Sequence, residues 1–194
     1  MLIKSFVTFV FFIFSVGISN AQNFRFVEAT IDDIHVALKS GDMTCRQIVS
    51  GYLDRINSFD QDTKLNAITV INKNALARAD EIDLALKTGE TLGSLYCAPM
   101  LIKDNYDTHD LPTTGGSIAL KNSFPPDDAF MVRRLREADA IVIAKTNMAE
   151  WAFSPRQTKS SSFGTTANAY DLDRVPAGSS GGTASGTAAS FAVA

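Results

Sequence analysis

The sequence predicts an α/β fold of layered helices and strands. Short apolar runs typical of buried strands alternate along the chain with segments whose apolar residues recur at helical spacing. The 194 residues are enough for one domain with a sizeable core. An apolar content of 45% and a charged content of 20% are ordinary for a globular protein.

Two helices are expected near the start of this domain. Thr30 is a typical N-cap for a helix that continues to Lys39 and is stopped by Gly41. Thr44 opens a second helix that ends at about Phe59. Its apolar face is formed by Ile48, Val49, Tyr52, Leu53 and Ile56.

A short β-like run at 67–71 precedes a third helix, which starts at Asn72 or Asn74 and ends near Lys87, before Gly89. The run at 98–102 is a buried-type strand. Three further elements follow: a helix capped by an aspartate and ending near 138, a strand at 140–144 and a short helical turn at 147–153. The capping residue is Asp127 or Asp128. The segment 160–174 is polar and irregular, and 180–193 has the small residues of a tightly packed helix.

Composition excludes several functional classes. The formal net charge is -3 and the basic residues are scattered, so no nucleic-acid partner is expected. His35 and His109 are the only histidines, and they form no cluster with the two cysteines that would suggest zinc. Cys45 lies in a helical pattern and Cys97 just before a buried strand. Their pairing is open from sequence, and we favour two free thiols.

The N-terminus has the pattern of an export signal. Lys4 precedes a nearly continuous apolar stretch at 6–18, and Ser19-Asn-Ala21 supplies small residues for signal peptidase. A membrane span needs about 20 apolar residues, so this stretch is short for one. We therefore expect a cleaved signal peptide at 1–21 and a secreted or periplasmic protein. A membrane anchor at 6–18 is the alternative.

The run from Ala177 to Ser190 contains only Ala, Gly, Ser and Thr. Such a segment contributes backbone freedom and hydroxyl groups rather than core volume. A phosphate-binding P-loop would need a lysine, and none follows Lys159. Residues 178–182 match the nucleophile-elbow pattern G-x-S-x-G with Ser180 at its centre. No histidine or acidic residue follows Asp173, however, and the segment before the motif contains a proline and is a poor strand. An α/β-hydrolase triad would therefore require a histidine and an aspartate beyond residue 194.

A serine–lysine arrangement remains, with Lys103 at the end of the apolar run 98–102. A lysine accepts a proton only when it is neutral, and its ordinary pKa is about 10.4. Burial disfavours the ammonium form and lowers that pKa. The alternative is a lysine that reaches solvent or pairs with Asp104 or Asp107.

Five segments, taken in order, resemble the amidase signature family. They are Ala-Pro-Met-Leu-Ile-Lys-Asp-Asn at 98–105, Thr-Thr-Gly-Gly-Ser at 113–117, Ala-Lys-Thr-Asn-Met-Ala-Glu at 144–150, Phe-Gly-Thr-Thr-Ala-Asn at 163–168 and Gly-Ser-Ser-Gly-Gly at 178–182. The resemblance extends from about residue 31 to the end of the chain. It implies the amidase-signature fold, in which a mixed sheet is flanked by helices. It also implies hydrolysis of carboxylic amides by a Ser-Ser-Lys triad through an acyl-enzyme. It implies no metal or cofactor, and a small-molecule or peptide amide as substrate.

The resemblance also assigns roles to individual residues. Lys103 matches the general base, and Ser179 matches the bridging serine, which follows a cis peptide bond and contacts substrate. Ser180 would pack against or cap the next helix. Ala152, Phe153 and Ser154 correspond to a stretch that lines the acyl pocket.

One departure concerns the nucleophile. The family's nucleophilic serine lies in a second glycine-rich segment, roughly two dozen residues after the bridging serine. Only 15 residues follow Ser179. Residues 22–194 are therefore expected to be the N-terminal part of one domain, truncated before the nucleophile strand. Ser185 and Ser190 are disfavoured as substitutes because no glycine-rich bend exposes them. The alternative is a catalytically silent fragment or a ligand-binding domain.

Overall fold

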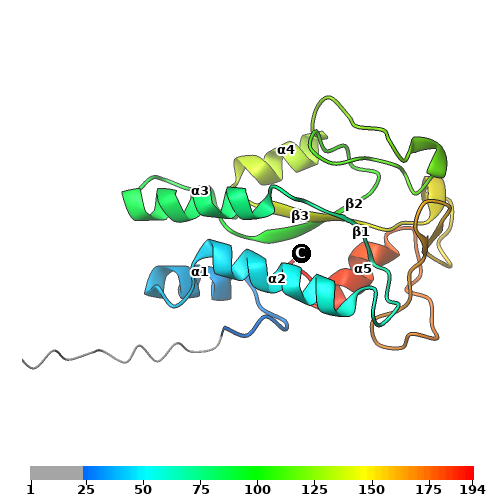
Figure 1. Ribbon diagram of the computed structural model, residues 1–194, viewed down its shortest axis with the longest axis horizontal. Helices are drawn as coiled ribbons and strands as arrows, with labels where there is room; N and C mark the ends of the chain where they lie inside the picture. The colour runs from blue at the N-terminus through cyan, green and yellow to red at the C-terminus, as the bar shows by residue number, and fades with distance from the viewer. Residues whose placement is uncertain (1–23) are drawn as a thin grey trace, which may run out of the picture.

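The computed structural model describes residues 24–194, which form a small mixed sheet between layers of helices (Figure 1). The expected signal peptide at 1–21 and the alternative anchor at 6–18 lie outside the described residues. None of the helices within 24–194 is long and apolar enough to cross a membrane.

The first two helices begin and end where their capping residues predict. Helix α1 (Ile31–Ser40) and helix α2 (Cys45–Phe59) each have a complete capping box, with Thr30 and Thr44 as N-caps. Gly41 ends α1 in the left-handed conformation that glycine adopts easily, at φ 76°. Helix α3 (Ala75–Thr88) follows Asn74, whose side chain makes no capping hydrogen bond.

The central sheet has the order β1-β3-β2, which confirms the mixed sheet. Strand β3 (Ile141–Thr146) is buried along its whole length. Strand β1 (Ile68–Ile71) pairs with it antiparallel and β2 (Pro99–Lys103) pairs with it parallel. This pairing places Lys103 opposite Thr146, at the end of both parallel strands.

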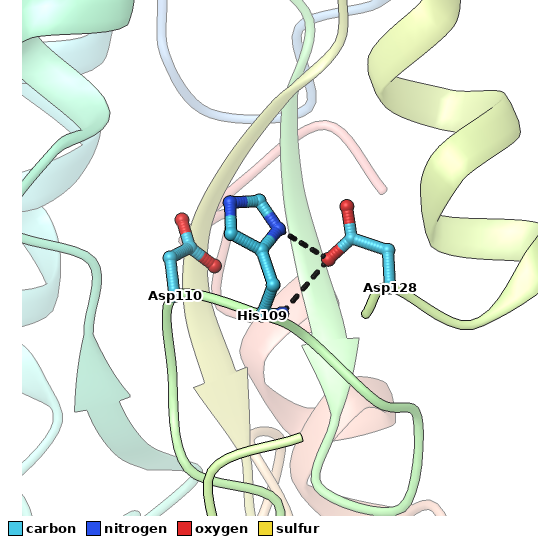
Figure 2. A group of neighbouring side chains, drawn as sticks. All are labelled: His109, Asp110 and Asp128. Carbon is cyan, nitrogen blue, oxygen red and sulfur yellow. Dashed lines mark hydrogen bonds and ion pairs between the residues drawn. The ribbon is translucent and has the colours of Figure 1, made fainter. Parts of the chain in front are cut away.

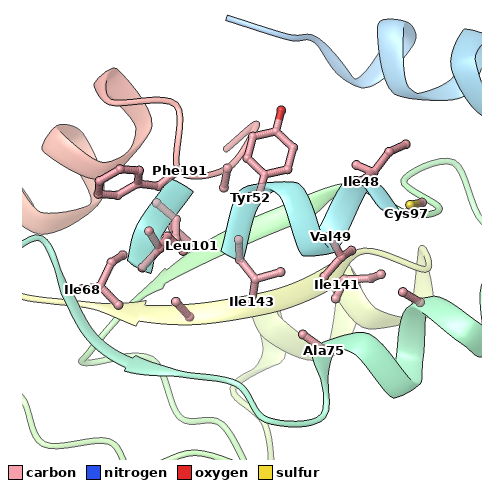
Figure 3. Close-up of a cluster of buried hydrophobic side chains, with 14 of the residues drawn as sticks. Ile48, Val49, Tyr52, Ile68, Ala75, Cys97, Leu101, Ile141, Ile143 and Phe191 are labelled. Atoms are coloured by element: carbon pink, nitrogen blue, oxygen red, sulfur yellow. The ribbon is translucent and has the colours of Figure 1, made fainter. Parts of the chain in front are cut away.

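Helices cover both faces of this sheet. In Figure 1, α1, α2 and α5 (Gly181–Ala188) lie on one side of the sheet and α4 (Phe130–Glu137) lies on the other. Apolar side chains of α2 and α3 pack with Leu101, Ile141 and Ile143 in the larger core cluster (Figure 3). A smaller cluster joins Val132 of α4 to the opposite sheet face.

Two helix boundaries differ from the prediction. Asp127 and Asp128 do not cap α4, which begins after Ala129. The carboxylate of Asp128 instead accepts a hydrogen bond from the backbone N–H of His109 at 3.0 Å. Helix α5 ends at Ala188 rather than near 193, because the fully buried Phe191 turns the chain into the core.

The residues after α5 run beside β2. The N–H of Leu101 donates to the carbonyl of Ala194 at 2.7 Å, and the N–H of Val193 donates to the carbonyl of Pro99 at 3.3 Å. The remaining short elements are η1 (Ile118–Leu120), η2 (Glu150–Ala152), β4 (Lys159–Ser160) and β5 (Gly164–Thr165).

The expectation of two free thiols was wrong, because Cys45 and Cys97 form a disulfide. Cys45 is the first residue of α2 and Cys97 lies just before β2. The packing of α2 against the sheet brings their Cα atoms to 5.6 Å, although 52 positions separate them in sequence. Both residues are fully buried.

Candidate active site

The structure brings Lys103 and Ser179 into direct contact. The Nζ atom of Lys103 lies 2.7 Å from the Oγ atom of Ser179, across 76 positions of sequence. Lys103 is half-buried at the end of β2, and this burial lowers the pKa of its amine. The neighbouring carboxylate of Asp104 accepts hydrogen bonds from the N–H groups of Thr114 and Gly116. Within residues 24–194 Lys103 forms no ion pair with Asp104 or Asp107, and the lysine nearest the Asp104 carboxylate is Lys145.

Close backbone packing positions Ser179. The peptide bond between Gly178 and Ser179 is cis, as the family resemblance implies. A Cβ atom on Gly178 would lie 2.5 Å from the carbonyl oxygen of Ser154, so this position has room only for glycine. The N–H of Ala149 donates to the carbonyl of Ser179 at 2.9 Å. Together these contacts fix the backbone that presents the Ser179 hydroxyl.

The first turn of α5 is attached to the end of β3. The N–H of Gly182 donates to the carbonyl of Asn147 at 3.0 Å, and the hydroxyls of Thr146 and Thr183 are 2.7 Å apart. A Cβ atom on Gly182 would lie 2.3 Å from the Asn147 carbonyl oxygen. Ser180 is the N-cap residue, but its exposed side chain makes no capping bond. The expected capping by Ser180 is thus absent.

A cavity of about 350 Å³ opens beside Lys103. Its walls are mostly apolar side chains of β2 and α4, with hydroxyl groups at the α5 end; they include Leu101, Ile102, Met131, Val132, Leu135, Ser180 and Thr183. A largely apolar cavity next to a polar pair is typical of a small-molecule site.

The three residues assigned to the acyl pocket lie elsewhere. Ala152, the last residue of η2, and Phe153 are exposed, and Phe153 is 92% exposed. Ser154 approaches the 178–182 turn through its backbone carbonyl, at Gly178. None of the three lines the cavity beside Lys103. Their role in substrate binding stays a prediction.

Sequence reasoning gave no role to two buried polar residues that follow the β3 pattern. The side-chain oxygen of Asn147 accepts from the Ser160 hydroxyl at 2.8 Å, and its amide donates to the Thr166 hydroxyl at 3.0 Å. Asn147 thereby holds the loop that packs under Gly178. Lys145 is fully buried, and this burial lowers the pKa of its amine to about 8, although the Asp104 carboxylate opposes the shift. The signal for both was a polar residue at or directly after a run of buried strand type.

His109, Asp110 and Asp128 form a separate cluster (Figure 2). Such residue types often bind a metal ion, but here the Arg136 guanidinium engages both carboxylates. It lies 2.6 Å from an oxygen of Asp110 and 3.0 Å from an oxygen of Asp128. The His109 ring is 2.9 Å from Asp128. The cluster is therefore an ion-pair network that joins the loop after β2 to α4.

Comparison with known proteins gives a consistent match over most of the chain. The family model described as Amidase matches residues 47–194. A glutamyl-tRNA(Gln) amidotransferase subunit from Alkaliphilus metalliredigens is 43% identical over 166 residues, which cover 85% of this chain and 33% of that protein.

Solved structures agree with this match. The native peptide amidase from Stenotrophomonas maltophilia is 37% identical with a TM-score of 0.81, covering 87% of this chain and 36% of that one. A bacterial aryl acylamidase of the amidase signature family is 27% identical with a TM-score of 0.79, covering 86% and 34%. The chain thus spans about a third of the length of these relatives.

Proposed function

The chain belongs to the amidase family, and we propose that the protein hydrolyses carboxylic amides through a proton relay between Lys103 and Ser179. The single observation that supports this most strongly is the 2.7 Å contact between the Lys103 amine and the Ser179 hydroxyl.

The proposed relay uses this contact for a series of proton transfers. In its neutral form, Lys103 accepts the Ser179 hydroxyl proton while Ser179 accepts a proton from the nucleophilic hydroxyl. The nucleophile oxygen then attacks the amide carbonyl carbon, and the relay returns the proton to the departing amine nitrogen. Water cleaves the resulting acyl-enzyme. Proton transfer of this kind contributes typically about 10²- to 10⁴-fold to the rate. We assign the nucleophile to no residue of this chain.

Burial increases the neutral fraction of the Lys103 amine. The low-dielectric surroundings of Lys103 penalise its ammonium form, which is the cause of its lowered pKa. A larger fraction of the amine is therefore neutral near pH 7 than for a solvated lysine. The relay needs no metal ion or cofactor.

The walls of the cavity and the similar solved structures indicate the class of substrate. The cavity beside Lys103 is lined mainly by apolar side chains, which favours an amide with an apolar acyl or side-chain group. The similar solved structures include a peptide amidase and an aryl acylamidase. We therefore propose a small-molecule or peptide amide.

A second candidate is the amidotransferase reaction, which the 43% identity to a glutamyl-tRNA(Gln) amidotransferase subunit favours. The disulfide favours the exported hydrolase instead, because disulfides form and persist mainly in oxidising compartments. We propose secretion or export to the periplasm on this basis and on the N-terminal sequence pattern. A catalytically silent fragment or ligand-binding domain is the third candidate.

The test begins with the coding sequence downstream of the Ala194 codon. The product of the complete reading frame is assayed for release of ammonia or amine from a peptide amide and an aryl amide. We expect Lys103→Ala to lower this activity by at least about 10²-fold, since the general base is lost. The matched control is Lys121→Ala, at an exposed lysine.

The outcomes separate the three candidates. Hydrolysis that survives Lys103→Ala would remove the relay from the mechanism. Glutamine-dependent amidation of Glu-tRNA, without hydrolysis of free amides, would favour the amidotransferase. A stop codon directly after Ala194 and an inactive product would favour the silent fragment.

A further inference from the structure

We infer that Lys145 is a positioning residue for the Lys103–Ser179 pair, because its buried side chain ties down the loop that follows Lys103. The inference rests on the proposed function, since it assumes that the geometry of this pair matters for proton transfer. Lys145 touches neither Lys103 nor Ser179 through a hydrogen bond of its side chain. Its influence passes through the 104–116 loop.

All three hydrogen bonds of the Lys145 ammonium group are made to residues of the 104–116 loop. Its Nζ atom donates to the carbonyl of Tyr106 at 2.7 Å, to the Thr113 hydroxyl at 2.9 Å and to the Thr108 hydroxyl at 3.2 Å. An ammonium group has three protons, so these three acceptors satisfy it. A buried charge is costly unless it is satisfied in this way. The conformation of the 104–116 loop is therefore stabilised by Lys145, and the buried charge of Lys145 is stabilised by the loop.

The residue directly after Lys103 is held by the same loop. The N–H of Asp104 donates to the carbonyl of Thr146 at 3.1 Å, and its carbonyl accepts from Gly115 at 3.0 Å. Its carboxylate accepts from the Thr114 N–H and hydroxyl and from the Gly116 N–H. The carboxylate also lies 4.0 Å from the Lys145 Nζ. The backbone at Lys103 is thus fixed by a fully bonded buried network.

The two faces of strand β3 contact the segments that follow Lys103 and Ser179. Successive side chains of a strand point to opposite sides. Lys145 faces the 104–116 loop, whereas Thr146 contacts Thr183 on α5, the helix that follows Ser179. One rigid, fully buried strand end therefore sets the position of Lys103 relative to Ser179.

This role predicts a measurable effect on the Lys103 amine. Without the Lys145 contacts, the loop is free to move and water reaches the end of β2. The burial that lowers the pKa of Lys103 then weakens. Its pKa rises toward the ordinary value of about 10.4. A lysine that only stabilised the fold would not alter this titration in a variant that stays folded.

The experiment measures the labelling rate of Lys103 by acetic anhydride from pH 6 to 11, using peptide mass spectrometry of the whole chain. The variants are Lys145→Met and Thr113→Val, which removes one acceptor of the Lys145 amine. The matched control is Thr69→Val, because the buried Thr69 hydroxyl has no hydrogen-bond partner within 24–194. Far-UV circular dichroism identifies the variants that remain folded.

We expect the labelling rate of Lys103 at pH 8 to fall by about threefold or more in both variants, as its pKa rises by half a unit. Thr69→Val should leave the rate unchanged. Folded variants with the wild-type Lys103 titration would overturn the inference. If Lys145→Met does not fold, Thr113→Val alone decides. An ordinary Lys103 titration in the wild-type protein would instead overturn the proposed function.

Discussion

Removing the Cys45–Cys97 disulfide should cost the protein a large part of its stability. A disulfide restricts the unfolded chain, and the entropy it removes grows with the length of the closed loop. These cysteines are 52 positions apart, which corresponds to about 4 kcal/mol at 25 °C in the chain-entropy treatment. Native domains have a total free energy of unfolding of only about 5–15 kcal/mol. Loss of the bond would therefore leave a marginal fold.

The assay is urea unfolding of the wild-type protein, Cys45→Ala, Cys97→Ala and the double variant, monitored by circular dichroism. Either single change breaks the bond, so the double variant should lose little more than each single one. With an unfolding slope of about 2 kcal/mol per molar urea, the midpoint falls by about 2 M. Dithiothreitol should lower the wild-type midpoint similarly and leave the double variant unchanged.

Two results would refute this reasoning. One is a wild-type protein that carries two titratable thiols after denaturation without reductant. The other is a loss of less than about 1 kcal/mol in both single variants, which would mean that the closed loop contributes little to the unfolded-state entropy.

Two further predictions concern the end of β3. Gly182→Ala should lower the free energy of unfolding by about 1–3 kcal/mol in urea titrations, because the new Cβ would lie 2.3 Å from the Asn147 carbonyl oxygen. The control Thr187→Ala, at an exposed site of α5, should change the free energy of unfolding by no more than about 0.5 kcal/mol. The free energy of unfolding of the wild-type protein, relative to that of Lys145→Met, should rise by about 3 kcal/mol between pH 8 and pH 10.5. The folded pKa of Lys145 is about 8, so in this pH range Lys145 carries its proton in the unfolded chain but not in the folded protein. A difference that stays constant across this range would contradict the prediction.

Local sequence signals explain which parts of the fold were predictable. The capping boxes at Thr30 and Thr44 act within one helical turn, and both helices start where these residues predict. The α/β class followed from apolar runs of strand length, whereas the mixed sheet was implied by the family resemblance. These signals depend on neighbours only a few positions away in the chain.

The errors arose where distant residues decide the local structure. Asp128 resembles a helix cap, but it binds His109, which lies 19 positions away. Helix α5 stops early because the buried Phe191 joins the core and the following residues lie beside β2. The disulfide likewise depends on the packing of α2 against the sheet. No local pattern reports these contacts.

In the candidate site, too, some residues were predictable from the sequence and others depended on distant contacts. Lys103 and Ser179 were identified from motifs, and their contact was expected from the family resemblance. Lys145 and Asn147 lie within a segment of that resemblance, yet a strand pattern alone does not show what a buried polar side chain bonds to. Their partners lie up to 39 positions away, at Tyr106 for Lys145.

The central claim is that Lys103 is a desolvated amine in contact with Ser179. An NMR titration of ¹³C-labelled lysine side chains, with Lys103→Met for assignment, tests it directly. The account predicts that Lys103 titrates below the ordinary lysine value of about 10.4, and that Ser179→Ala moves the Lys103 midpoint. A Lys103 midpoint at the ordinary lysine value that does not change in Ser179→Ala would contradict it.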